Sequence, residues 1–313
     1  MERAFVFPGQ GSQAVGMGQA LAAAFPIARE TFEEVDDALD QHLSRLMFEG
    51  PAEELTLTEN AQPALMAVSL AIVRVLGAEA GFELGKNGRF VAGHSLGEYS
   101  ALAAAGSLDL PTTARLLKRR GRAMQAAVAV GEGAMAALLG LDLDTVREIA
   151  EEASQGEVCS PANDNAPGQV VVSGHKAAVE RAVQLAATRG GRRSIMLPVS
   201  APFHCSLLQP AADEMAEALG DITLQAPSLP LVSNVTASAV VDPQEIRKLL
   251  VEQVTAPVRW REGVLYMKEA GVEQLVEIGA GKVLSGLARR IDPELTGVSI
   301  QSPDDIDAFL KSV

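Results

Sequence analysis

Cysteine is scarce in this chain. Only Cys159 and Cys205 occur among its 313 residues, and their spacing fits no metal-binding pattern. A framework of disulfides is therefore excluded, and we expect a cytoplasmic protein that contains no disulfide and binds no metal.

Basic residues are also in short supply. The chain has 26 Lys and Arg against 40 Asp and Glu, which gives a net charge of −14. Nucleic acids and anionic membranes attract cationic proteins, so this balance argues against both as main partners. The stretch from Ala4 to Ala28 is uncharged, but Pro8, glutamines and glycines interrupt it, so it predicts neither a signal peptide nor a membrane span.

A nucleotide-binding loop is missing as well. The glycine-rich loop Pro8–Gln13 follows an expected strand, but its glycines do not have the Gly-x-Gly-x-x-Gly spacing. No strand ending in an acidic residue follows about 20 residues later, and no Gly-Lys-Ser/Thr occurs. Both observations exclude nucleotide binding.

Hydrophobic residues are abundant, at 48% of the chain, and predict a globular protein with a large core. Outside residues 131–199, apolar strands and helices alternate, which indicates an α/β fold whose mostly parallel sheet is covered on both faces. Strands are expected at 4–7, 89–92, 229–232 and 272–278, and helices at 26–48, 62–76, 96–105, 112–128, 243–254, 263–270 and 282–291.

The middle of the chain has a different element order. Strands expected at 134–140, 158–160, 169–173 and 194–199 and helices at 142–154 and 176–189 give β-α-β-β-α-β, the ferredoxin-like unit. We predict a core of residues 1–130 and 200–313 and an inserted ferredoxin-like subdomain of residues 131–199.

The most informative motif is Gly93-His94-Ser95-Leu96-Gly97. It fits Gly-x-Ser-x-Gly, lies between an expected strand and an expected helix, and predicts a nucleophile elbow with Ser95 as the nucleophile. The plainer alternative is a turn of small residues that carries a surface serine.

A serine nucleophile needs a base, and His204 is the best candidate. It ends the loop Pro198–His204, whose two prolines stiffen the backbone at the exit from the inserted unit. The alternative is an ordinary loop histidine. The other histidines suit other roles, namely a solvated surface (His42), packing of the elbow (His94) and a cap or surface position (His175).

An acid to orient the base is not evident. Asp142, Asp144 and Asp164 lie between Ser95 and His204, but all three belong to the predicted insert. A two-residue Ser–His site, oriented by a main-chain carbonyl, would explain this gap. Cys205 is better interpreted as a small buried hydrophobe than as a thiol nucleophile.

Arg120 lies in the middle of the apolar face of the expected helix at 112–128, whereas Arg115, Lys118, Arg119 and Arg122 lie on the opposite, solvated face. A buried guanidinium requires a partner, so Arg120 is either in a structural ion pair or a clamp for a substrate carboxylate. A hydrolase of neutral esters would not need such a clamp.

Together these residues resemble the malonyl-CoA:acyl carrier protein transacylases of bacterial type II fatty acid synthesis. The matching motifs appear in the family's order over nearly the whole chain: Phe7–Gln13, Gly93–Ser100, Arg120-Gly121, Pro202-Phe203-His204, Gln253 with Pro257-Val258 and Trp260, and Glu277–Leu284. Ala201 and Cys205 stand where Gly and Ser are more usual in the family.

The resemblance implies an α/β-hydrolase-like core with a ferredoxin-like insert and a ping-pong acyl transfer. Ser95 would take the malonyl group from coenzyme A, with His204 as base and Arg120 on the free carboxylate. The amides of Gln10 and Leu96 would form the oxyanion hole, and a main-chain oxygen near Gln253 would orient the histidine.

The resemblance also implies malonyl-CoA and acyl carrier protein as partners, no cofactor beyond the substrate thioester, and chain elongation in fatty acid synthesis as the destination. We expect a monomer. A polyketide pathway stays open, as do two other functions: a serine esterase or thioesterase, and a carrier-binding module without turnover. Candidate carrier contacts are basic: Arg189, Arg192, Arg193, Lys282, Arg289 and Arg290.

Overall fold

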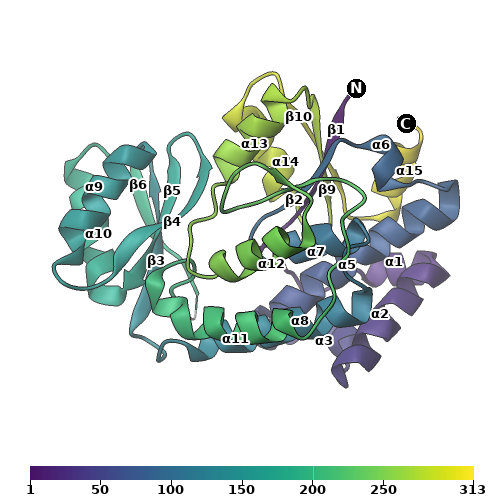
Figure 1. Ribbon diagram of the computed structural model, residues 1–313, viewed down its shortest axis with the longest axis horizontal. Coiled ribbons are helices and arrows are strands. Elements are labelled where there is room, and N and C mark those ends of the chain that lie inside the picture. Colours follow the sequence, from purple (N-terminus) through teal and green to yellow (C-terminus); the bar gives the residue numbers. More distant parts are fainter. Residues whose placement is uncertain (200) are drawn as a thin grey trace.

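The computed structural model describes residues 1–199 and 201–313, so Ser200 of the predicted base-bearing loop lies outside the described residues. Two β-sheets lie next to each other, each with its own helices (Figure 1). The predicted mixed α/β fold, with one mostly parallel sheet and one separate antiparallel sheet, is confirmed.

The larger sheet has the strand order β10-β9-β1-β2-β7-β8. Neighbouring strands are parallel except at the β7–β8 edge, where the loop 233–238 reverses the chain. The strand bounds are β1 Arg3–Phe7, β2 Phe90–Gly93, β7 Leu231–Val232, β8 Ala239–Val240, β9 Gln274–Ile278 and β10 Thr296–Ile300.

Helices cover both faces of this sheet, because its strands are apolar on both sides. Phe5 and Phe7 of β1 pack into the core that contains α5 and α8, whereas Ala4 and Val6 pack into a second cluster with α13 and α14. Alternate residues of a strand point to opposite faces, so this one strand contributes to both cores.

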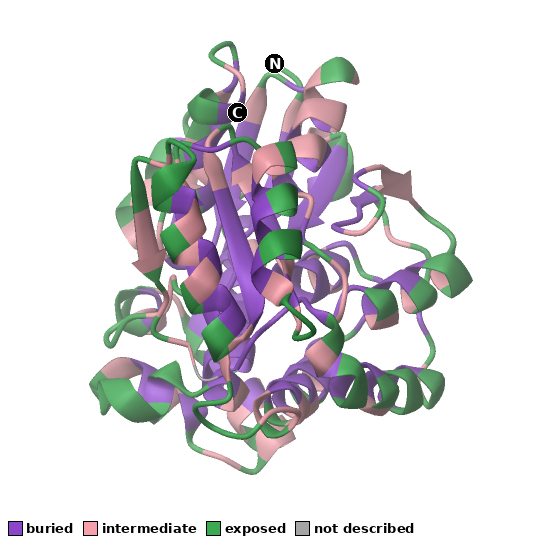
Figure 2. Cartoon of the chain, turned by 90° about the vertical axis from the view of Figure 1, so that its left-hand side faces the viewer, coloured by how far each residue is buried: buried purple, intermediate pink, exposed green. Residues whose placement is uncertain are grey.

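The smaller sheet consists of β3 Gly133–Leu139, β4 Cys159–Ala166, β5 Gln169–His175 and β6 Arg193–Met196 in the order β4-β5-β3-β6. With α9 Leu143–Ser154 and α10 Lys176–Thr188 it forms the predicted β-α-β-β-α-β unit. The two helices bury their inner sides on the strands and expose their outer sides (Figure 2). The division at residues 130 and 200 stays a prediction.

The remaining helices have the following bounds: α1 Gln19–Ala24, α2 Pro26–Leu39, α3 Leu43–Glu49, α4 Ala52–Thr56, α5 Thr58–Ala80, α6 Leu84–Asn87, α7 Gly97–Ala104, α8 Leu110–Ala126, η1 Ser206–Leu208, α11 Gln209–Gly220, α12 Pro243–Glu252, α13 Trp260–Glu269, α14 Val283–Ile291 and α15 Pro303–Leu310. By length and apolar composition α5 could span a membrane, but 78% of its most apolar window is buried inside the protein.

Several sequence predictions were wrong in extent: the strand expected at 194–199 ends at Met196, and the helix expected at 62–76 runs over Thr58–Ala80. The helix expected at 26–48 is two helices, because Asp40 adopts a left-handed conformation (φ 47°) that ends α2. The strand expected at 158–160 continues to Ala166 in β4, since register shifts on either side of Asn163 accommodate Pro161 within the strand. The strand β10 and the helices α11 and α15 had not been predicted.

Strand β4 also joins the two sheets. Val258 donates its amide to Ala162 O at 2.8 Å and accepts from the Asp164 amide at 3.0 Å. Arg261 of α13 pairs with the Asp164 carboxylate at 2.8 Å. These contacts fix the smaller sheet against the larger one and hold the space between them open in one geometry.

Substituting Gly93→Ala should destabilise the fold, because a Cβ on Gly93 would lie 1.9 Å from the carbonyl carbon of Gly97. Overpacking of this kind costs about 1–3 kcal/mol, so thermal unfolding should shift to lower temperature. Gly286→Ala is the matched control: it lies in α14 with open space around it, and alanine there should stabilise by about 1 kcal/mol. An unchanged melting temperature for Gly93→Ala would contradict the close approach of β2 and α7.

Candidate active site

The turn between β2 and α7 holds Ser95 in a strained conformation. Its φ is 53°, in the left-handed region that side-chain-bearing residues rarely adopt. Gly93 and Gly97 make this possible, because strand and helix meet there with no room for a Cβ on either. The elbow predicted from the sequence is therefore present, and its strain is typical of a functional turn.

His204 lies directly against this serine. Its Nε2 is 2.8 Å from Ser95 Oγ, and its Nδ1 is 2.8 Å from the main-chain oxygen of Gln253. A carbonyl can only accept, so Nδ1 carries the proton and Nε2 is left to accept the serine hydroxyl. The structure thus brings together the predicted pair with the main-chain oxygen that the resemblance implied.

The three aspartates between Ser95 and His204 have other partners. Asp142 caps α9 by accepting the Thr145 amide at 2.8 Å, Asp144 pairs with Arg147 at 2.8 Å, and Asp164 is paired with Arg261. The orientation of His204 therefore comes from a peptide carbonyl, which brings no net negative charge to the site.

The charge state of His204 follows from its surroundings. Its side chain is buried, and burial, aided by the nearby Arg120 cation, lowers its pKa from 6.5 to about 3. The imidazole is therefore neutral at physiological pH, the form that a general base requires.

Arg120 lies fully buried on the inner face of α8 and reaches the serine. Its Nη2 donates to Ser95 Oγ at 3.0 Å and to Gln253 Oε1 at 2.9 Å, and its Nη1 donates to Gln62 Oε1 at 2.9 Å. The Tyr99 ring lies beneath the guanidinium, 5.7 Å from centroid to carbon. The partners that touch it are neutral, so a positive charge is held beside the nucleophile.

Two residues that sequence reasoning missed support this arrangement. Glu98, 1% exposed, accepts from the Asn234 amide and from Gln253 Nε2. Asn234 in turn accepts the Ser95 amide at 2.8 Å and donates to Gly93 O at 2.8 Å. Two features of the sequence could have pointed to them. Glu98 is an acid in the first turn of the Ala- and Leu-rich helix α7, and Asn234 comes just after the buried strand β7.

A cavity of about 370 Å³ opens at the serine, between the two sheets. Gln10, Leu96 and Arg120 line it from the larger sheet's side, and Met135 and Asn163 line it from the smaller sheet. Gly9 lies against the His94 carbonyl, which brings the Pro8–Gln13 loop to the elbow. No hydrogen bond joins the Gln10 or Leu96 amide to any residue within 1–199 or 201–313.

The remaining histidines and Cys205 do not take part in this geometry. His94 Nε2 lies 2.8 Å from Asn165 Oδ1 and its ring lies near Trp260, as expected for a packing residue of the elbow. His42 is exposed, and His175 accepts the Val158 amide at 2.9 Å. Burial raises the pKa of the Cys205 thiol, which disfavours a reactive thiolate.

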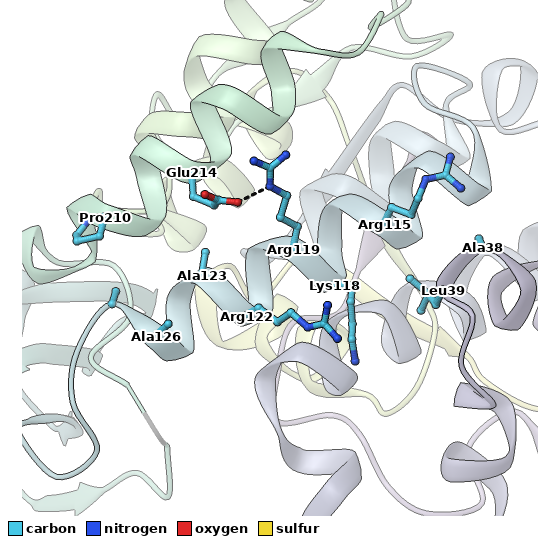
Figure 3. Close-up of a pocket in the computed structure, with 11 residues that line it drawn as sticks. Ala38, Leu39, Arg115, Lys118, Arg119, Arg122, Ala123, Ala126, Pro210 and Glu214 are labelled. Atoms are coloured by element: carbon cyan, nitrogen blue, oxygen red, sulfur yellow. Dashed lines mark hydrogen bonds and ion pairs between the residues drawn. The ribbon is translucent and has the colours of Figure 1, made fainter.

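The outer face of α8 borders a second hollow of about 680 Å³ against α2 and α11 (Figure 3). Arg115 is exposed there, and Arg119 pairs with Glu214. The prediction of a solvated face is wrong for Lys118, which is 8% exposed: its ammonium is enclosed by Glu59, Gln41 and Asn60.

Comparison with known proteins gives consistent matches. The acyl transferase domain model matches residues 4–290. The malonyl CoA-acyl carrier protein transacylase of Escherichia coli K12 is 48% identical over 308 residues, 98% of each chain, and that of Bacillus subtilis is 42% identical over 99% of this chain and 96% of its own.

Solved structures agree. An acyl-carrier-protein S-malonyltransferase from Bartonella henselae is 54% identical, with a TM-score of 0.97 over 100% of this chain and 99% of its own. A malonyl-transacylase solved in complex with its type II polyketide synthase acyl carrier protein is 44% identical, with a TM-score of 0.96 over 100% of both chains.

The low pKa of His204 can be tested in the folded protein. Burial disfavours the imidazolium, so the His204 ring should stay neutral from pH 8 down to pH 5, whereas free histidine in the same sample takes up its proton near 6.5. Long-range ¹H–¹⁵N spectra of histidine-labelled protein would resolve both. Below pH 6.5 the unfolded chain binds this proton and the folded one does not, so His204 should lower the unfolding free energy as pH falls towards 3. A His204 midpoint near 6.5 would contradict the buried, carbonyl-oriented geometry.

Proposed function

This chain belongs to the acyl transferase domain family, and we propose that it transfers the malonyl group of malonyl-CoA to the phosphopantetheine thiol of acyl carrier protein through a malonyl-Ser95 intermediate. The single observation that carries the proposal is the buried guanidinium of Arg120 beside a serine–histidine pair. An acyl chain on Ser95 that ends in a carboxylate would meet this cation. Bidentate guanidinium–carboxylate pairing is strong in a dry site.

In the first half-reaction Ser95 Oγ attacks the thioester carbonyl while its proton moves to His204 Nε2. The carbonyl oxygen becomes an oxyanion, stabilised by the main-chain amides of Gln10 and Leu96. Collapse of this intermediate breaks the carbon–sulfur bond, and His204 returns the proton to the departing thiolate of coenzyme A. Malonyl-Ser95 remains, with its carboxylate on Arg120.

The second half-reaction runs the same steps with the carrier's thiol. That thiol gives its proton to His204 and attacks the Ser95 ester, the tetrahedral intermediate collapses, and Ser95 takes the proton back. The neutral His204 suits both directions, because it accepts and returns one proton in each half-reaction. The product is the chain-elongation unit of fatty acid synthesis.

Hydrolysis by an esterase or thioesterase is the less favoured function. Nothing in the hydrolysis of a neutral ester uses a buried cation 3.0 Å from the nucleophile. The relatives' names favour acyl transfer as well. A carrier-binding module without turnover is disfavoured by the intact hydrogen bond between Ser95 and His204.

For the protein's setting, we propose a cytoplasmic monomer that uses no cofactor of its own, since the substrate supplies the activated thioester. Two buried, unpaired cysteines and the net charge of −14 support the compartment.

The proposal predicts a covalent malonyl-enzyme on Ser95. After mixing with malonyl-CoA, intact-protein mass spectrometry should show one malonyl adduct on the wild type and none on Ser95→Ala. His204→Ala should form the adduct at least about 100-fold more slowly, the usual scale for a lost general base. A persistent adduct on Ser95→Ala would rule out this nucleophile.

Arg120→Ala should change the choice of acyl group as well as the rate. Loss of one partner of a buried charge pair costs roughly 2–5 kcal/mol, so malonyl transfer should fall by about 30-fold to several thousand-fold. Acetyl transfer, which has no carboxylate to pair, should fall less. Arg119→Ala is the control, because Arg119 lies on the outer face with Glu214 and should leave the malonyl-to-acetyl ratio unchanged. Equal losses for both acyl groups in Arg120→Ala would assign Arg120 a structural role.

For the carrier we propose a docking surface at one end of the smaller sheet, formed by Arg192, Arg193 and Arg290. The first two are exposed at the start of β6, and Arg290 of α14 reaches β5 by donating to Gln169 Oε1 at 2.7 Å. The Arg192 amide donates to Leu139 O, on the strand beside β5. Arg189 contributes less, because Glu148 and Glu152 neutralise it.

Reversing Arg192 and Arg193 to Glu should raise the KM for the acidic carrier and leave acylation by malonyl-CoA nearly unchanged. Reversing Arg29 and Arg45, exposed on α2 and α3, makes the same charge change far from the smaller sheet and should matter little (Figure 1). Added salt should weaken the wild-type carrier reaction, because exposed charges are screened over about 8–10 Å. If neither added salt nor the reversal of Arg192 and Arg193 changes the carrier reaction, the carrier docks on another surface.

A further inference from the structure

Among the described residues, Glu98 is the carboxyl group enclosed in the hydrogen-bond network of the site, and the acyl transfer described above gives it no role. It is 1% exposed, on the first turn of α7. Both of its oxygens accept from N–H donors: Oε1 from the Asn234 amide and Oε2 from Gln253 Nε2. Donors on both oxygens favour the ionised carboxylate, whereas burial favours the neutral acid.

This carboxylate is connected to Arg120 by a single amide group. Arg120 Nη2 donates to Gln253 Oε1 at 2.9 Å, and the Nε2 of the same amide donates to Glu98. The amide lies between a buried cation and a buried anion with its dipole aligned to both. In a low-dielectric interior, hydrogen bonds in such a chain strengthen one another.

We propose that Glu98 is a positioning residue for malonyl transfer, whose carboxylate, when ionised, is the counter-charge of Arg120 in the empty site and acts on it through the side-chain amide of Gln253. The inference rests on the proposed malonyl transfer. It assigns Arg120 a resident carboxyl group that lies one amide away and makes no direct hydrogen bond to the guanidinium.

The proposal also predicts that malonylation of Ser95 changes the ionisation of Glu98. The charged and titratable groups that face Glu98 among the described residues are Arg120 on α8 and Tyr99 on its own helix. Burial raises the pKa of Glu98 to about 8, and Arg120 opposes the rise. A malonyl carboxylate on Arg120 brings a second negative charge close to Glu98 and raises this pKa further. Malonylation should therefore draw a proton from solvent onto Glu98.

The first test needs only the wild-type protein. Near pH 8, where about half of Glu98 is ionised, a weakly buffered stopped-flow measurement with a pH indicator dye would count protons during acylation by malonyl-CoA and by acetyl-CoA. Both acyl donors release the same thiol, coenzyme A. The difference in proton uptake between them therefore reports the effect of the malonyl carboxylate alone. We expect a larger proton uptake with malonyl-CoA, by up to about half a proton per enzyme, and no difference at pH 6.

The second test uses variants. At pH 9, where Glu98 is mostly ionised, Glu98→Gln should lower malonyl acylation by about 10- to 100-fold and acetyl acylation by less, because a small displacement of a positioned group costs up to about 100-fold. Gln253→Ala should give a similar change in the malonyl-to-acetyl ratio, and the double variant should be no worse than Gln253→Ala alone, because Glu98 acts through that amide. Ser100→Ala is the control: Ser100 is buried on the same helix and should leave the ratio unchanged.

The outcomes separate the two proposals. If no malonyl adduct forms on wild-type Ser95, malonyl transfer itself is wrong. If the adduct forms but proton uptake is the same with both donors at pH 8, or Glu98→Gln slows both equally, the role of Glu98 is overturned. If Glu98→Gln does not fold, the wild-type proton count still decides.

Discussion

A buried guanidinium needs hydrogen-bond partners, and the architecture of this site follows from the partners of Arg120, whose two Nη atoms are bonded and whose Nε has no partner among the described residues. A single residue does most of the work. Gln253 offers its side-chain oxygen to Arg120, its side-chain nitrogen to Glu98 and the Ser95 carbonyl, and its main-chain oxygen to His204. The cation clamp, the base and the elbow are therefore held by one side chain and one peptide, so their distances are coupled.

The two sheets complete the site without contributing to its proton chemistry. The larger sheet carries the elbow and the loop with Gln10, and the smaller one closes the cavity with residues such as Met135 and Asn163. Val258 and Arg261 fasten β4 to the core and so hold the smaller sheet against the larger one at this cavity.

The sequence was sufficient for the parts of the site that local patterns encode. A glycine on each side of Ser95 predicts the elbow, and the helical periodicity of α8 predicts that Arg120 is buried. The same periodicity failed for Lys118, because Glu59 comes from α5 and encloses its ammonium. Glu98 and Asn234 were missed for a related reason: they are 136 residues apart, and their role exists only after the strands assemble. The helix predicted at 26–48 ends at Asp40, which adopts a left-handed conformation. Hydrophobic periodicity does not reveal the conformation of a single residue.

The use of a carbonyl rather than a carboxylate behind His204 follows from the same cation. A carboxylate in contact with His204 would also lie near Arg120, raise the histidine's pKa and compete with the malonyl group for the guanidinium. A peptide oxygen orients the imidazole without doing either. Among the described residues of the network the carboxyl group is that of Glu98, which lies one amide away from the guanidinium and therefore does not compete directly for it. Within residues 1–199 and 201–313 no carboxylate is bonded to His204 or to Arg120, so a neutral imidazole and a charged guanidinium can both lie against Ser95.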